Sequence, residues 1–168
     1  EHAGFARFVD PHTIQTDNGF HIQGRKFIIC AGGQSRNLPI PGIEHTITHS
    51  DAWYLRDIPE SMVVVGAGAT GVQVASIFRN FGCQVSLFEQ SSRILSVEDE
   101  DVSAAMAAAY RANGMMVVEG FNGVDAVEKH DDHLRFLYRV DDRQHSLETG
   151  AVVLAVGWIA NADALNLA

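Results

Sequence analysis

The chain has 168 residues and a formal net charge of −9; 46% of its residues are hydrophobic and 20% are charged. These proportions are typical of a soluble globular protein with one domain, or one domain and a piece of another. The twelve Lys and Arg residues are scattered and no apolar run approaches the roughly 20 residues that span a bilayer, so neither nucleic acid nor a membrane is an expected partner.

The chain up to residue 61 predicts short strands followed by irregular structure. Its first residues are neither a basic signal region nor an initiator Met, which indicates a processed or cut-out chain. Runs rich in Phe, Val and Ile, separated by turn-forming residues, predict strands over 4–9, 12–16, 20–22 and 26–30. Residues 31–61 are interrupted by Gly and Pro. Within them, 43–47 is expected to be extended and 50–56 to form one or two helical turns capped by Ser50.

The next part of the chain carries a clear strand, helix, strand pattern. The continuous apolar run at 62–65 predicts a parallel strand buried on both faces. A helix is expected over 70–81, ended by Gly82, and a second strand over 85–88. A second helix is expected to begin near the acidic run 98–101 and to end by Gly114, with Val102, Met106, Ala109 and Tyr110 as its apolar stripe.

The last third predicts a change from parallel to antiparallel strands and back. A parallel strand is expected over 115–118, three antiparallel strands over 122–149, and a fully apolar strand over 152–156. The expected fold class is α/β: a Rossmann-like, mostly parallel sheet with helices on both faces, an antiparallel three-stranded crossover and extra N-terminal strands.

The six residues Gly66 to Gly71 match the pattern G-x-G-x-x-G between the predicted strand and helix. In this context the pattern indicates a dinucleotide site. Gly66 permits the tight turn, Gly68 lets the backbone approach a pyrophosphate, and Gly71 lets the helix pack close to the strand. The free amides of the first helical turn, including those of Ala69 and Thr70, would face the phosphates.

Glu89 follows Gly71 by 18 residues and ends the second predicted strand. Its carboxylate can accept hydrogen bonds from the adenosine ribose hydroxyls and would repel a 2′-phosphate, which favours NADH over NADPH. Arg93 could pair with a 2′-phosphate, so NADPH stays open. Two alternatives to the dinucleotide site are a glycine-rich turn that binds nothing and the adenosyl cofactor site of a methyltransferase, whose loop usually reads G-x-G-x-G.

Four stretches together resemble the pyridine nucleotide–disulfide oxidoreductases, flavoprotein reductases that include dihydrolipoamide dehydrogenase and glutathione reductase. They are the strand and loop at 27–33 with Leu38-Pro-Ile-Pro-Gly42; the glycine loop with Glu89; Arg93-Ile-Leu95 with Glu98-Asp99; and 153–157 with 161–165. The resemblance covers about residues 4–168. Gln73, Trp158 and Ala160 depart from it, standing where Glu, Arg and Pro are common in the family.

The resemblance implies an FAD-dependent NAD(P)H oxidoreductase in the intact enzyme, cytoplasmic and homodimeric, in which NAD(P)H passes hydride to the flavin. Residues 1–55 would be a segment of the FAD domain, 56–157 the NAD(H) domain with Gly157 near the nicotinamide, and 158–168 the return to the FAD domain. The family's first glycine fingerprint, its later Gly-Asp motif and its redox cysteine pair are not in this sequence. We therefore expect a central piece that binds NAD(H), holds FAD poorly and does not turn over alone. A non-catalytic NAD-binding or sensing module is the other alternative, and the final electron acceptor stays open.

No catalytic or metal-binding residue is predicted from the remaining side chains. Cys30 and Cys83 lie in apolar contexts and are expected to be small buried residues, compatible with a reducing cytoplasm. The segment from His130 to His133 is expected to be a solvated hairpin turn rather than a metal site. Trp158 either stacks on a ligand or covers the edge of the sheet.

Overall fold

The computed structural model of the chain describes residues 2–167. These residues form two compact units, one made of 2–34 with 158–167 and a larger one made of 35–157. Residues 35–55, which the resemblance assigns to an FAD-domain segment, pack within the larger unit. Among the described residues, no helix is long and apolar enough to cross a membrane.

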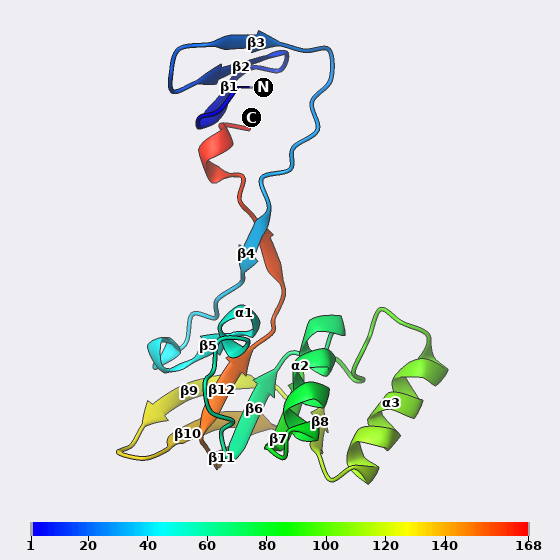
Figure 1. Ribbon diagram of the computed structural model, residues 1–168. Coiled ribbons are helices and arrows are strands. Elements are labelled where there is room, and N and C mark those ends of the chain that lie inside the picture. The colour runs from blue at the N-terminus through cyan, green and yellow to red at the C-terminus, as the bar shows by residue number, and fades with distance from the viewer. Residues whose placement is uncertain (1, 168) are drawn as a thin grey trace. The chain divides into compact units, whose positions relative to one another are not determined.

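The larger unit is built on a five-stranded parallel sheet (Figure 1). Its strands, in spatial order, are β5 (Ile47–Thr48), β12 (Ala151–Leu154), β6 (Ser61–Val65), β7 (Gln84–Glu89) and β8 (Met116–Glu119). From β6 the chain moves through β7 to β8, whereas β12 lies on the other side of β6. The carboxyl end of β6 is therefore a switch point of the strand order, the place where open α/β sheets bind ligands.

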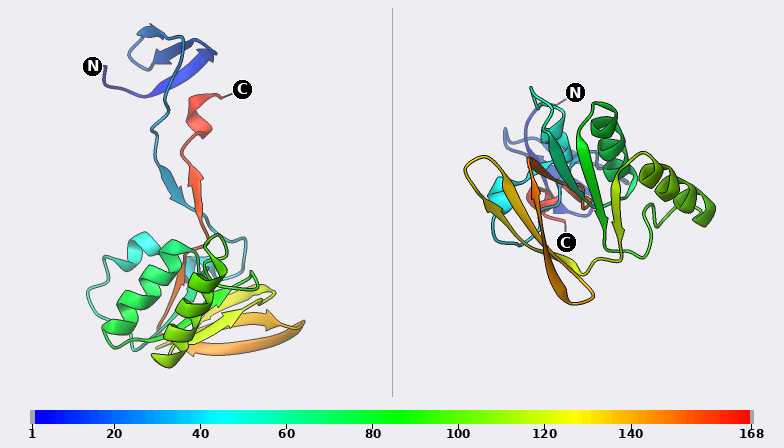
Figure 2. Two further views of the ribbon diagram at one scale, coloured as in Figure 1. Left: turned by 90° about the vertical axis from the view of Figure 1, so that its right-hand side faces the viewer. Right: turned by 90° about the horizontal axis from the view of Figure 1, so that it is seen from below.

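The α-helices of the described residues cover only one face of this sheet, which corrects the expectation of helices on both faces. The sheet residues Met62, Val64 and Leu87 share a buried cluster with helices α1 (His49–Ala52), α2 (Ala69–Asn80) and α3 (Glu100–Ala112). The alternate residues Val63, Val65 and Phe88 pack instead against Val127 and Phe136 of an antiparallel sheet. Figure 2 shows this second sheet and the helices α2 and α3 on opposite sides of the parallel sheet.

The antiparallel sheet lies where the sequence predicts it, within residues 122–149. Its strands are β9 (Gly123–Lys129), β10 (Leu134–Val140) and β11 (Arg143–Thr149), with β10 in the middle. Asp141 and Asp142 form the second turn with φ of 48° and 61°. Two successive residues with positive φ are what a two-residue hairpin with the right-handed strand twist requires, and Asp tolerates that conformation.

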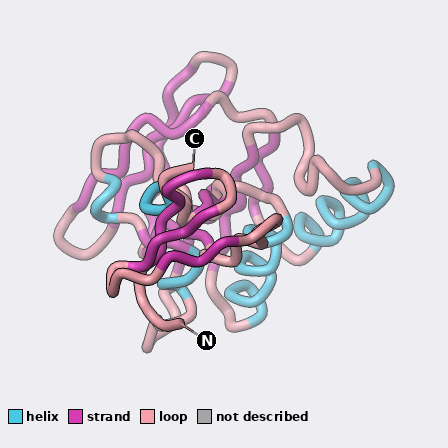
Figure 3. Tube along the Cα trace, turned by 90° about the horizontal axis from the view of Figure 1, so that it is seen from above, coloured by secondary structure: helices cyan, strands magenta, loops and turns pink. Residues whose placement is uncertain are grey.

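The smaller unit contains a three-stranded antiparallel sheet, drawn in magenta in Figure 3. Its strands are β1 (Ala6–Asp10), β2 (Thr13–Thr16) and β3 (His21–Gln23), and a separate pair is formed by β4 (Gly33–Ser35) and β13 (Trp158–Ala160). A short 3-10 helix, η2 (Asp163–Leu165), completes the unit. The strand predicted over 26–30 is not formed, and Ile28 in that segment is 91% exposed.

Two local predictions before β6 are wrong in their details. Residues Ile43–His45 form a 3-10 helix, η1, rather than extended chain. Helix α1 is capped by Thr48 rather than Ser50: the amide of Asp51 donates to the Thr48 hydroxyl, and the Thr48 amide donates to the Asp51 carboxylate. The same Thr48 hydroxyl holds the pKa of Asp51 below its usual value.

The two cysteines differ in environment. Cys83 is buried as predicted, and its burial raises its pKa to about 11. Cys30 is exposed, which corrects the expectation that it is buried. Because the strand predicted over 26–30 does not form, the apolar context of Cys30 in the sequence does not become a buried one in the fold.

Candidate functional site

The chain turns from β6 into α2 at Gly66, and the structure requires glycine there for two reasons. Gly66 has a φ of 92°, a left-handed conformation that residues with a Cβ rarely adopt. A Cβ at this position would also lie 2.5 Å from the carbonyl oxygen of Ala155, which follows β12. The amide of Gly66 donates to the carbonyl of Phe88 at 2.8 Å, so the turn begins while the chain is still bonded to β7.

Gly71 allows the first turn of α2 to pack directly on the loop. A Cβ at Gly71 would lie 1.8 Å from the carbonyl oxygen of Gly66, which is backbone and cannot move aside as a side chain can. Gly66 and Gly71 are therefore needed by the fold itself, whether or not a ligand binds.

Gly68 is different, because nothing in the fold explains the absence of its side chain. It is exposed, and a Cβ placed there would meet no atom within 4 Å. Its φ of −72° and ψ of −174° are open to any residue. Glycine at this position keeps free a space that lies directly at the amino end of α2.

The amino end of α2 is suited to bind an anion. Gly68 is the N-cap residue and provides no side-chain cap, and the first turn contains no acidic residue. Ala69 is exposed and Thr70 half-buried in that first turn. The first amides of a helix have no partner within the helix, and its dipole favours negative charge at this end by about 0.3–1 kcal/mol.

Glu89 ends β7 and its carboxylate is directed at the glycine loop. One carboxylate oxygen accepts the amide of Ala67 at 2.7 Å, and the other accepts the amide of Ser91 at 2.8 Å. Glu89 is half-buried. Because an ionised carboxylate offers about four acceptor positions, these two bonds leave capacity for hydroxyl donors from a ligand.

Arg93, considered from the sequence as a partner for a phosphate, is engaged elsewhere. Its guanidinium donates to the backbone carbonyls of Leu95, Ser96 and Glu98 at 3.0–3.2 Å.

Gly157, which the resemblance places near the nicotinamide, lies three residues beyond the end of β12. It is exposed and has a φ of 107°. The glycine loop, Glu89 and Gly157 all belong to the larger unit and lie at or just beyond the carboxyl ends of the three neighbouring strands β6, β7 and β12.

Sequence reasoning missed Glu119, which ends β8 beside Glu89 in the strand register. One oxygen of Glu119 accepts the amide of Ile94 at 2.9 Å, and the other forms a 2.6 Å ion pair with Arg111 of α3. The signal available in the sequence was a second Glu at the end of the next parallel strand. Glu119 thus holds the segment after Glu89 through the Ile94 amide, while Arg111 holds Glu119.

The His130–His133 segment forms the predicted hairpin turn, with His130 and His133 flanking it. Their rings stack with centroids 4.9 Å apart, because residues opposite each other across a two-residue hairpin loop point to the same face. The carboxylates of Glu128 and Glu148 lie 3.7–3.8 Å from the two imidazoles, and the Arg135 guanidinium lies 3.7–3.9 Å from the same carboxylates. Within residues 2–167, no group of three or more His, Cys, Asp or Glu side chains is arranged to hold a metal ion.

A family profile described as pyridine nucleotide-disulphide oxidoreductase matches residues 2–168. The chain belongs to this family. The family uses FAD and NAD(P)H. The chain's membership of this family agrees with the resemblance drawn from the motifs and argues against the methyltransferase alternative.

Several relatives in the family align with almost the whole chain. Mercuric reductase of Staphylococcus aureus is 28% identical over 166 residues, which are 98% of this chain and 30% of the relative. Glutathione reductase of Nostoc sp. is 27% identical over 98% of this chain and 35% of its own length, and dihydrolipoyl dehydrogenase of Acholeplasma laidlawii is 29% identical over 89% and 45%. The chain thus spans between about a third and somewhat less than half of the length of these relatives.

The fold of the chain is also similar to that of a solved flavoprotein disulfide reductase. The HOCl-induced flavoprotein disulfide reductase RclA from Escherichia coli is 28% identical and superposes with a TM-score of 0.77, covering 97% of this chain and 37% of its own. The chain therefore corresponds to a domain-sized part of these relatives and has the mixed α/β fold seen in this flavoprotein disulfide reductase.

Proposed function

We propose that the glycine loop, Gly66 to Gly71, binds the diphosphate of NAD(H). The observation that carries this proposal is Gly68, whose missing side chain leaves open space at the uncapped amino end of a 12-residue helix. Neither local backbone geometry nor packing requires glycine at that position. A ligand that must approach the backbone does require it, and the helix amides there favour an anionic one.

We further propose that Glu89 binds the adenosine ribose and selects NADH over NADPH. Its carboxylate lies against the loop and keeps acceptor capacity for the ribose hydroxyls. A 2′-phosphate at that place would meet like charge. Arg93, the nearby cation, donates three hydrogen bonds to backbone carbonyls and is therefore not directed at a 2′-phosphate, which further supports NADH over NADPH.

In the intact protein, the proposed role of this chain is to hold NAD(P)H for hydride delivery to a flavin. The cofactors supply the hydride chemistry, and the protein supplies binding and orientation. Residues 56–157 are the proposed NAD(H) domain, with Gly157 near the nicotinamide. We also propose that the intact enzyme is a cytoplasmic homodimer.

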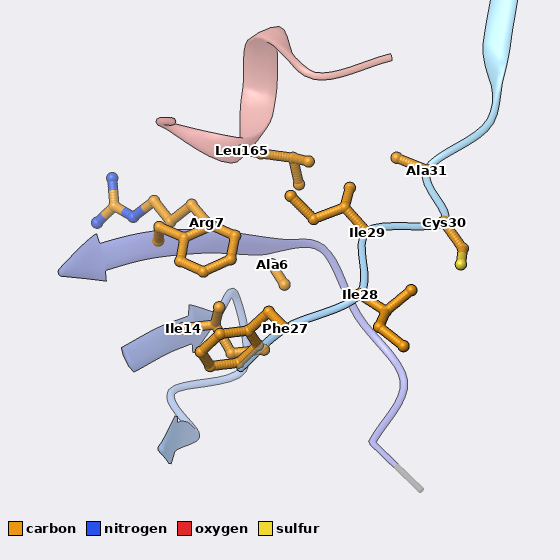
Figure 4. Close-up of a pocket in the computed structure, with 10 residues that line it drawn as sticks. Ala6, Arg7, Ile14, Phe27, Ile28, Ile29, Cys30, Ala31 and Leu165 are labelled. Carbon is orange, nitrogen blue, oxygen red and sulfur yellow. The ribbon is translucent and has the colours of Figure 1, made fainter. Parts of the chain in front are cut away.

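The proposal assigns residues 1–55 and 158–168 to parts of an FAD domain. The apolar surface of the smaller unit supports this for the residues that belong to that unit: Phe5 is 86% exposed, and a pocket of about 190 Å³ is lined mainly by apolar side chains. Figure 4 shows Ile29 and Leu165 pointing toward each other, with Phe27 lying beside Ile14 in another part of the pocket lining. Such surface is suited to packing against further protein of the same domain.

Calorimetric titration of the 168-residue chain with NADH, NADPH and S-adenosylmethionine tests the binding proposal. We expect saturable NADH binding, weaker NADPH binding and no binding of S-adenosylmethionine. The absence of saturable NADH binding by a folded chain would refute the proposal. NADH oxidation by the longer protein, with FAD and a dye as acceptor, then separates an enzyme from a non-catalytic NAD-binding or sensing module.

A further inference from the structure

The segment after Glu89 forms a compact turn that is closed by the Arg93 side chain together with one backbone bond, in which the Glu98 amide donates to the Leu95 carbonyl at 2.9 Å. The Arg93 guanidinium donates from Nη1 to the carbonyls of Leu95 and Glu98, at 3.2 and 3.0 Å, and from Nη2 to the carbonyl of Ser96 at 3.0 Å. Leu95 has a φ of 49°. A left-handed conformation is unfavourable for leucine and persists only where the surroundings hold it.

This turn is joined directly to the glycine loop through Leu95. The Leu95 amide donates to the Ala67 carbonyl at 2.8 Å, while the Ala67 amide donates to Glu89 at 2.7 Å. Ala67, the residue between the first two glycines, is fully buried and has both of its backbone polar groups bonded. Glu89 and Leu95 therefore hold this residue from its two ends.

The bond from Leu95 also determines where the Gly68 amide points. The Ala67 carbonyl and the Gly68 amide belong to one peptide unit, which is planar and trans, so the two groups point in opposite directions. With the carbonyl held by Leu95, the Gly68 N–H faces away from the turn. A hydrogen bond accepted by that carbonyl also polarises the N–H of the same peptide and strengthens it as a donor.

Other partners hold the buried start of the turn independently of Arg93. The amide of Ile94 donates to Glu119 at 2.9 Å, and the carbonyl of Ile94 accepts the hydroxyl of Ser103 at 2.6 Å. Because Ile94 is fully buried and held from β8 and α3, loss of the Arg93 bonds should loosen residues 95–98 without unfolding the unit.

We propose that Arg93 is a positioning residue of the cofactor site. It closes the turn that keeps Leu95 in its left-handed conformation, and Leu95 in turn aims the Gly68 amide at the cofactor diphosphate without Arg93 touching the cofactor. This inference rests on the proposed function, since it assigns the Gly68 amide to the diphosphate. It differs from a role in which Arg93 acts as a cation that binds a phosphate.

The variants Arg93→Lys and Arg93→Gln separate these two roles, because a lysine keeps the charge but cannot reach three carbonyls with a planar fork. We expect both variants to weaken NADH binding by on the order of tenfold, the size of effect expected when one hydrogen bond to a charged group is lost. The matched control is Arg79→Lys. Arg79 also donates to backbone carbonyls, those of Asn113 and Cys83, and its removal should leave NADH affinity unchanged.

Amide hydrogen exchange gives a readout that does not depend on binding. Arg93→Lys should accelerate exchange of the Leu95 amide and leave that of Ile94 protected, since Glu119 still accepts it. Wild-type NADH affinity in Arg93→Lys, or a loss confined to Arg93→Gln, overturns the positioning role while the proposed function stands. Failure of the wild-type chain to bind NADH overturns the proposed function, and the positioning role with it.

Discussion

Replacing Gly68 and Gly71 separately by alanine should divide the effects of the glycine loop on folding and on binding. A Cβ at Gly71 would lie 1.8 Å from the Gly66 carbonyl oxygen, whereas ordinary contact begins at 3.4 Å. The helix and the loop would have to separate by about 1.6 Å, against a backbone atom. Overpacking typically costs about 1–3 kcal/mol, and an obstacle of backbone places Gly71→Ala at or above the upper end.

The same substitution at Gly68 should leave the fold intact. Its Cβ meets nothing within 4 Å and its backbone angles are allowed for alanine, so the unfolding free energy should be unchanged or rise by about 0.4–1 kcal/mol. The methyl group would instead occupy the space proposed for the diphosphate. Loss of one hydrogen bond to a charged group costs about 1.5–3 kcal/mol, so the Kd for NADH should rise roughly tenfold to a hundredfold.

Differential scanning calorimetry and NADH titration of the two variants measure these effects together. We expect Gly71→Ala to lower Tm by roughly 6–12 °C or more, from a cost of about 3 kcal/mol and about 2–4 °C for each kcal/mol in a chain of this size. Gly68→Ala should keep the wild-type Tm and bind NADH poorly. Wild-type NADH affinity in Gly68→Ala would refute the reasoning about the open space, and an unchanged Tm in Gly71→Ala would refute the reasoning about packing.

Three further predictions concern the carboxylate, a buried hydroxyl and the cysteines. Glu89→Gln should weaken NADH binding about tenfold in the same titration, because its amide group cannot accept both backbone N–H bonds; unchanged affinity would count against the ribose assignment. Tyr110→Phe should lower the unfolding free energy by about 1 kcal/mol in denaturant melts, since the Tyr110 hydroxyl donates to the Val72 carbonyl at 2.8 Å. Burial raises the pKa of Tyr110, so the folded state favours its neutral phenol. The contribution of Tyr110 to the unfolding free energy should therefore be fully present below about pH 10 and be lost as pH rises further. If the unfolding free energy of Tyr110→Phe showed the same pH dependence as that of the wild type, this reasoning would be wrong. Iodoacetamide at pH 8 should modify the exposed Cys30 but not Cys83, whose pKa of about 11 leaves roughly one thiolate in a thousand, and mass spectrometry showing equal labelling would exclude that difference.

Much of the site was predictable because its signals are local. The apolar run before Gly66, the spacing of the three glycines and the position of Glu89 all act through neighbouring residues, and β6, α2 and β7 lie within a residue or two of their predicted bounds. The turn at Asp141-Asp142 was also predictable, since a short polar side chain there permits the positive φ that a tight hairpin needs.

The apolar stripe of α3 shows where local reasoning fails. The pattern predicts Val102 and Ala109 on the buried face, but the buried residues are Ser103, Ala107 and Tyr110, and Val102 is 50% exposed. Ser103 is buried because its hydroxyl donates to the carbonyl of Ile94, a partner supplied by another segment. Hydropathy alone predicts that Val is more deeply buried than Ser in a helix. It contains no information about a hydrogen-bond acceptor from another segment, such as the Ile94 carbonyl.

The sequence by itself therefore determined the order of the elements from β6 to β12, the glycine loop and the acidic residue beyond it, because each follows from backbone geometry and residues close along the chain. The tertiary structure alone decided which layer covers each face of the sheet, that Arg93 bonds to carbonyls, and that Glu119 and Leu95 support the loop. Those features depend on hydrogen bonds and packing between segments that are distant or irregular, and for such pairings a single sequence contains no periodic signal.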